Sequence, residues 1–147
     1  MKIKKQVYRY LEWKSPEEMH HTSLEWISEL KFIKDEKLFL NNLIKSYTLQ
    51  ITTLGLFEES RKLITAISNA ELDLDLLLKK VRVHENQLSI MLDDVDQPIM
   101  EKAYTETHRD LIFTIDNYLM EYRKLKGSLF QMISKVMKKE KQKRLLN

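Results

Sequence analysis

Apolar residues recur along the chain at alternating spacings of three and four, and the first stretch of this pattern runs from Met19 to Leu54. Such spacing places the residues on one face of an α-helix and follows a heptad pattern. We call this set of positions the seam. Its first stretch consists of Met19, Ser23, Trp26, Leu30, Ile33, Lys37, Leu40, Ile44, Tyr47, Ile51 and Leu54, with Ser23 and Lys37 as polar interruptions. Phe32, Phe39 and Leu43 are expected to widen the buried face.

The first helix has clear start and stop signals. Ser15 is a good N-cap, Pro16 fits the first helical position, and Glu18 completes a capping box. Gly55 follows the last seam residue and can adopt the left-handed conformation that ends many helices. The pattern therefore predicts a helix over residues 16–53.

A second helix is predicted over residues 57–93. Its seam is Leu63, Ile67, Ala70, Leu74, Leu77, Val81, His84, Leu88, Met91 and Val95, widened by Phe57, Ile64, Leu78 and Leu92. Ser68 and Glu71 form a second capping-box pattern, so a kink or a second turn near Asn69 is an alternative. The seam crosses this point without a change of phase, which favours a continuous helix.

A third helix is predicted over residues 98–145, opened by Pro98 after an Asp-rich turn. Its seam is Tyr104, His108, Leu111, Ile115, Tyr118, Tyr122, Leu125, Leu129, Met132 and Val136. Gly127 interrupts this helix at a cost of about 1 kcal/mol relative to Ala.

Three long helices with short connections predict an all-α fold, an elongated antiparallel three-helix bundle of spectrin-like architecture. The bundle is expected over residues 15–136, between a basic N-terminal arm (1–14) and a basic helical C-terminal tail (137–147). A homodimer that pairs two such chains is an alternative. The 147 residues contain two Gly, two Pro and no Cys, which excludes disulfides, thiol catalysis and Gly-rich phosphate loops. No apolar run is long enough to span a membrane, so we expect a cytoplasmic protein.

The net charge of +3 is unevenly distributed, because both ends of the chain are basic and the middle is acidic. The basic residues toward the C-terminus are Lys135, Lys138, Lys139, Lys141, Lys143 and Arg144. Cations at a helix C-terminus interact favourably with the helix dipole, so these residues suit a solvated helix end. The alternative is a tail that binds nucleic acid or another anionic surface. An acidic body and the absence of a recognition module weaken the nucleic-acid alternative.

Two histidines lie on the predicted seam. His84 and His108 are about equally many residues from the turn near residue 95, so they should lie at one level of the bundle. Trp26 and His84 are equally far from Gly55, so the matching level of the first helix is near Trp26. Glu25 and Glu29 flank that layer, and His21 lies about one turn away.

The histidine layer has two interpretations. Imidazoles and carboxylates that face inward from different helices can bind a transition-metal ion, here through His84, His108, Glu25, Glu29 and His21. A buried polar layer can instead fix the register of a long bundle, because slipped alignments leave it unpaired. In the second interpretation no cofactor is required.

No catalytic motif is present, and a slim bundle offers few concave pockets. We therefore expect a non-catalytic interaction or scaffold protein with a protein partner. Metal binding, and anionic-surface or nucleic-acid binding through the tail, are the alternatives. Aromatic and Met residues of the third helix could supply a partner face, namely Tyr104, Tyr118, Met120, Tyr122, Met132 and Met137. For Tyr104, Tyr118, Tyr122 and Met132, however, we favour a place in the core of the bundle.

Overall fold

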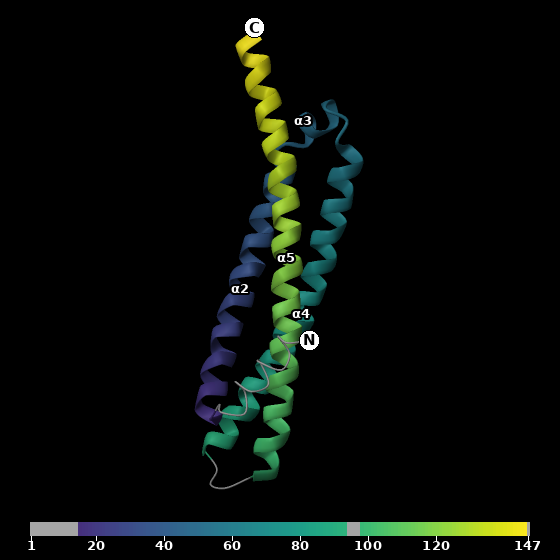
Figure 1. Ribbon diagram of the computed structural model, residues 1–147. Helices are drawn as coiled ribbons and strands as arrows, with labels where there is room; N and C mark the ends of the chain where they lie inside the picture. Colours follow the sequence, from purple (N-terminus) through teal and green to yellow (C-terminus); the bar gives the residue numbers. More distant parts are fainter. Residues whose placement is uncertain (1–14, 94–97, 147) are drawn as a thin grey trace, which may run out of the picture. The chain divides into compact units, whose positions relative to one another are not determined.

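The computed structural model describes residues 15–93 and 98–146, and these residues are almost entirely helical. The helices are α2 (Pro16–Ser46), α3 (Thr48–Thr53), α4 (Phe57–Asp93) and α5 (Pro98–Leu146) (Figure 1). No strand occurs within the described ranges, so the predicted all-α class is confirmed. The predicted N-terminal arm and Val95 lie outside the described residues.

Ser15 caps α2 as its sequence predicts. The backbone N–H of Glu18 donates to Ser15 Oγ at 3.2 Å, and the N–H of Met19 donates to the Ser15 carbonyl at 3.0 Å. The first bond satisfies an N–H group that lacks an intrahelical partner, and the second is the first i to i−4 bond of the helix. Helix α2 therefore begins at Pro16.

Gly55 ends α3 in the left-handed conformation, with φ of 72°. The N–H of Leu56 donates to the Ile51 carbonyl at 2.9 Å, and the N–H of Gly55 donates to the Thr52 carbonyl at 3.1 Å. This pair of bonds is the Schellman motif, which satisfies the last carbonyls of a helix. The predicted stop signal is thus confirmed.

The prediction of one unbroken helix over 16–53 is wrong at Tyr47. This residue has φ of −107° and ψ of 13°, and its N–H donates to the Ile44 carbonyl in a tighter turn. The hydroxyls of Ser46 and Thr48 donate to the carbonyls of Asn42 and Lys45, each at 2.9 Å. Such side-chain bonds compete with the regular helical pattern and accompany the break, although Thr22 makes a bond of the same kind within unbroken α2.

The two longer helices run without interruption, as predicted. Helix α4 is continuous through the second capping-box pattern at Ser68–Glu71, so the alternative of a second turn near Asn69 does not hold. Helix α5 continues through Gly127 and reaches Leu146, one residue beyond the predicted end.

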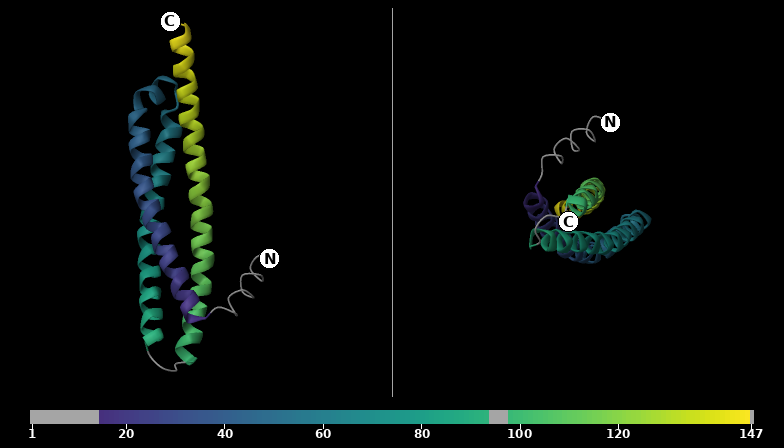
Figure 2. Two further views of the ribbon diagram at one scale, coloured as in Figure 1. Left: turned by 90° about the vertical axis from the view of Figure 1, so that its left-hand side faces the viewer. Right: turned by 90° about the horizontal axis from the view of Figure 1, so that it is seen from below.

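The chain divides into two compact units, and each long helix contributes one segment to each unit. Unit 1 comprises Met1–Phe32 and Asp75–Tyr118, and unit 2 comprises Ile33–Leu74 and Leu119–Asn147. Within unit 1, segments of α2, α4 and α5 lie side by side (Figure 2). A core cluster there joins Met19 of α2 to Leu88 and Met91 of α4, with Tyr104 of α5 packed against it.

Burial follows the seam closely in both units. Every described seam position is buried or half-buried, including the polar interruptions Ser23 and Lys37. Most of the residues that we expected to widen the seam are instead exposed: Phe32 is 66% exposed and Phe39 is 59% exposed, and Phe57 is also exposed. The buried stripe is therefore narrower than we expected. Only Leu78 among the expected additions is fully buried.

Within residues 15–93 and 98–146, no helix has the length and apolar character needed to cross a lipid bilayer.

Candidate functional site

The predicted histidine layer forms in unit 1. His84 of α4 and His108 of α5 are 1% and 0% exposed, and His84 Nε2 lies 2.9 Å from His108 Nδ1. At this distance one ring donates a hydrogen bond to the other. Trp26 of α2 stacks on His108 with ring centroids 4.7 Å apart. Counting residues from the two turns thus predicted correctly which residues of three helices meet.

His84 is held neutral by its surroundings. Burial lowers the pKa of His84 from 6.5 to about 4, because removal of water disfavours the charged imidazolium. His84 Nδ1 is buried and makes no hydrogen bond to the described residues. At neutral pH the His84 ring is therefore uncharged.

The other predicted metal ligands do not join this pair. His21 and Glu25 form a contact of 3.0 Å with each other, and both side chains are mostly exposed. Glu29 is also exposed. No group of three or more His, Asp or Glu residues that could hold a metal ion occurs in the described part of the chain. Of the predicted metal ligands, the structure therefore brings together only the imidazoles of His84 and His108, and no third ligand joins them among the described residues.

A second contact in unit 1 was not singled out from sequence. His20 Nε2 of α2 lies 2.9 Å from Glu85 Oε1 of α4, and both side chains are about one quarter exposed. The counting from the Gly55 turn that aligned Trp26 with His84 does not identify this contact, because it pairs Glu85 with Glu25, five residues from His20. The contact adds a specific polar link beside the histidine pair.

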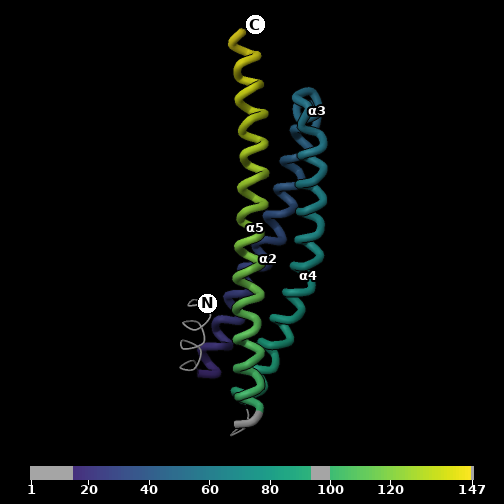
Figure 3. The backbone as a smooth tube through the Cα atoms, turned by 45° about the vertical axis from the view of Figure 1, so that its right-hand side comes forward, coloured from purple at the N-terminus to yellow at the C-terminus, as the bar shows by residue number. Residues whose placement is uncertain are grey.

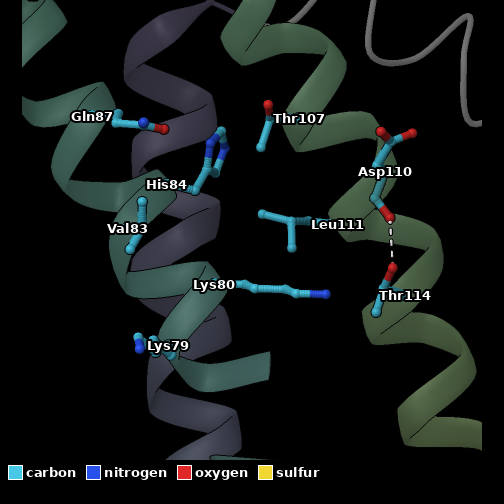
Figure 4. A pocket seen from close by; sticks show the side chains of 9 residues that line it. All are labelled: Lys79, Lys80, Val83, His84, Gln87, Thr107, Asp110, Leu111 and Thr114. Carbon is cyan, nitrogen blue, oxygen red and sulfur yellow. Dashed lines mark hydrogen bonds between the residues drawn. The ribbon is translucent and has the colours of Figure 1, made fainter. Parts of the chain in front are cut away.

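A groove of about 440 Å³ lies beside the histidine layer, between α4 and α5 of unit 1 (Figure 4). Its walls are Lys79, Lys80, Val83, His84 and Gln87 of α4 and Thr107, Asp110, Leu111 and Thr114 of α5. Lys80 extends from α4 across the groove, and Thr114 Oγ1 donates to the Asp110 carbonyl at 3.0 Å (Figure 4). The groove is mostly apolar, with one cationic and one anionic wall.

Unit 2 contains a polar cluster that sequence patterning indicated only through Lys37. Tyr122 Oη of α5 donates to Glu36 Oε1 of α2 at 2.5 Å, and Lys126 Nζ donates to the same oxygen at 3.0 Å. Lys37 is 1% exposed, and its Nζ lies 5.6 Å from the centroid of the Tyr122 ring, a cation–π geometry.

The pKa of Glu36 reports this arrangement. Burial raises the pKa, but the hydrogen bonds from Tyr122 and Lys126, together with the charge of Lys126, outweigh that effect. The net result is a pKa below the ordinary value of 4.5. Glu36 is therefore a carboxylate at neutral pH and holds α2 to α5 within unit 2.

The basic tail is helical and exposed. All six cations that we predicted as a tail site, from Lys135 to Arg144, lie on α5 and face solvent. Within unit 2, the last turns of α5 extend beyond α3 (Figures 1 and 3). Gln50 Nε2 of α3 donates to Glu140 Oε1 at 2.9 Å, which links the two elements.

A cleft of about 350 Å³ lies at this end of unit 2. Its residues are Leu49, Gln50, Thr53 and Leu54 on one side and Lys139, Glu140, Gln142, Lys143 and Leu146 of α5 on the other. We refer to it as the α3–α5 cleft. Of the six predicted tail cations, the cleft uses Lys139 and Lys143.

No protein-family model, curated protein or solved structure matches this chain.

Proposed function

We propose that the protein acts without catalysis, by binding another protein through the outer face of α4 in unit 1. The observation that carries this proposal is an exposed apolar stripe. Its members are Leu76, Val83 and Ile90, which are 62%, 52% and 55% exposed. They recur at intervals of seven residues.

This stripe is separate from the buried face of the same helix. Leu77, Val81 and Leu88 are buried, so α4 already has one apolar face in the core of its unit. Single exposed apolar residues are ordinary, but a regular second stripe on a helix marks a surface suited to a partner. A repeat of seven residues matches a helix that packs in coiled-coil fashion. Val83 also lines the groove beside the histidine layer, so the stripe continues into a hollow.

The supporting architecture is, in this proposal, an antiparallel three-helix bundle within each unit. The narrow seam and the contacts among α2, α4 and α5 support it. A partner helix would pack against the outside of α4 and enter the groove between α4 and α5. The polar layers, His84 with His108 and Glu36 with Tyr122, then fix the register of the helices and are not themselves the binding surface.

The test is affinity measurement after capture of a partner. A photo-crosslinking amino acid at position 83 identifies the protein that covers the stripe, and the purified partner is then titrated. We expect Val83→Asp to weaken binding at least about tenfold, since a charge would be buried against apolar surface. Ser28→Asp adds the same charge to an exposed position of α2 in the same unit and should leave the affinity within about twofold.

Capture alone does not support the proposal. A purified candidate partner that binds the Val83→Asp protein and the wild type with equal affinity, while both have the same helix content, would overturn it.

A further inference from the structure

The seam of α5 continues beyond the buried core of unit 2. Leu129, Met132 and Val136 are each 0% exposed. The same alternating spacing of three and four then leads to Lys139, Lys143 and Leu146. These three residues line the α3–α5 cleft. The face that packs inward up to Val136 thus opens into a cleft beyond it.

The opposite wall of the cleft comes from α3 and its end. Leu49 is 76% exposed, and Leu54 is half-buried. The cleft residues Leu49 and Thr53 are four apart, and Lys139, Lys143 and Leu146 are spaced four and three apart, so both walls have helical periodicity. A groove between two such walls fits an amphipathic helix. The chain turns at Gly55, so no helix of the described residues packs against the inward face of α5 beyond that turn, and a bound helix would occupy this place.

The charge of the cleft selects among helices. Lys139 and Lys143 lie in it, and Lys138, Lys141 and Arg144 are exposed on the neighbouring faces of α5. Glu140 is the one acidic residue in the last 14 positions of the sequence, and its carboxylate accepts the bond from Gln50. The cleft therefore combines leucine side chains with a strongly cationic rim, to which carboxylates are complementary.

The charge and shape of the cleft disfavour three other partners, namely a second copy of this chain, a nucleic-acid duplex and a membrane surface. A second copy that presented its own tail would place lysine against lysine, which is repulsive. A nucleic-acid duplex would meet the exposed lysines but has no apolar group for Leu49 and Leu146. A membrane surface is flat, whereas the leucines form the walls of a concave cleft.

We propose that the α3–α5 cleft is a binding site for an acidic amphipathic helix of a partner protein. Its apolar side chains lie against Leu49, Leu54 and Leu146, and its Asp or Glu side chains pair with Lys139 and Lys143. This site is independent of the α4 stripe, because it uses other residues in the other unit.

The experiment uses the full chain and synthetic peptides of about 16 residues, long enough to span the cleft as a helix. The first peptide has Leu at alternating spacings of three and four and Glu on the flanking positions. A second peptide has the same charge with Ser in place of Leu, and a third has Lys in place of Glu. Fluorescence anisotropy measures the affinity for each, and for a DNA duplex and vesicles of phosphatidylcholine and phosphatidylserine.

We expect saturable binding of the Leu/Glu peptide alone among the three peptides. Lys139→Glu with Lys143→Glu should weaken it at least about tenfold, while Lys138→Glu with Lys141→Glu, the same charge change outside the cleft, should cost at most about threefold. Leu49→Asp should weaken it as well. Helix content by circular dichroism confirms that each variant is folded.

Four results would overturn the site. The first is no binding of the Leu/Glu peptide, and the second is equal binding of the Ser peptide. The third is equal weakening by the two charge-reversal pairs, which would mean a diffuse electrostatic attraction. The fourth is displacement of the peptide by duplex or vesicles with higher affinity, which would assign the tail to an anionic surface. None of these results bears on the proposed function, in which Val83→Asp weakens binding of a partner to the α4 stripe.

Discussion

His84 Nε2 lies 2.9 Å from His108 Nδ1, and the two buried rings join α4 to α5 within unit 1. Each ring has its partner only when the two helices are in one register, because a shift along either helix would leave a buried imidazole without its hydrogen bond. In the function that we propose, the pair specifies the alignment of α4 and α5 at a place where apolar residues alone would tolerate sliding.

Replacing one member of the pair is expected to destabilise the protein. His84→Ala should lower the free energy of unfolding by about 2–4 kcal/mol, because it leaves a cavity and removes the hydrogen bond to His108. The double variant His84→Ala, His108→Ala should lose less than the sum of the two single variants, with a coupling of about 1 kcal/mol. Urea denaturation of the four proteins measures this cycle. Additive losses would mean that the rings do not interact energetically.

Acid should destabilise the protein through His84. Its pKa is about 4 in the folded chain and 6.5 in the ordinary environment of an unfolded chain, so the unfolded state binds more protons between these values. Stability is therefore fully present above pH 6.5 and decreases as the pH falls toward 4, by up to about 3 kcal/mol. Urea midpoints at several pH values measure the slope. The His84→Leu protein should lack most of this slope, and an unchanged slope in that variant would assign the effect to other groups.

The polar cluster of unit 2 predicts a second acid effect at lower pH. Tyr122→Phe removes the hydroxyl that donates to Glu36 and should lower the free energy of unfolding by about 1–2 kcal/mol. It should also raise the pKa of Glu36 toward 4.5, since one of the bonds that favour the carboxylate is lost. Stability from Glu36 is present above the ordinary pKa and decreases as the pH falls through the lowered one. Tyr47→Phe, at the half-buried break between α2 and α3, should cost less than about 0.5 kcal/mol. Equal losses in the two variants would contradict a special role for the bond.

Substitution of glycine by alanine is expected to change the stability of the protein in opposite directions at Gly127 and Gly55. Gly127 lies in an exposed part of α5, and an added Cβ would meet no atom within 4 Å. Gly127→Ala should therefore raise the free energy of unfolding by about 1 kcal/mol. Gly55 has φ of 72°, so Gly55→Ala should lower the free energy of unfolding by about 1 kcal/mol. Thermal unfolding followed by circular dichroism measures both, and the same sign for both variants would contradict the backbone assignment.

Local signals in the sequence were sufficient for the helix ends and for the histidine layer. Ser15 and Gly55 act through bonds to nearby backbone atoms, so their roles can be inferred from a few residues. The meeting of Trp26, His84 and His108 followed from counting residues from two turns, since each residue of a helix advances it by a fixed rise.

Other features depend on information that spacing does not contain. The break at Tyr47 is accompanied by hydroxyl bonds of Ser46 and Thr48 of a kind that many unbroken helices also accommodate. The contact of Glu36 with Tyr122 depends on how each helix is rotated about its axis, which a seam defines only coarsely. The exposure of Phe32 and Phe39 has the same origin, because these residues lie just outside a stripe whose width the sequence does not specify.

The central claim is that the outer face of α4 binds a partner while the histidine layer is structural. The most direct test is the affinity of the captured, purified partner for two double variants, Leu76→Asp with Val83→Asp and His84→Leu with His108→Leu. The account predicts that the first variant keeps its helix content and loses binding, and that the second variant still binds. Retained binding in the stripe variant, with loss of binding and of stoichiometric metal in the histidine variant, would contradict it and place the function at the histidine layer.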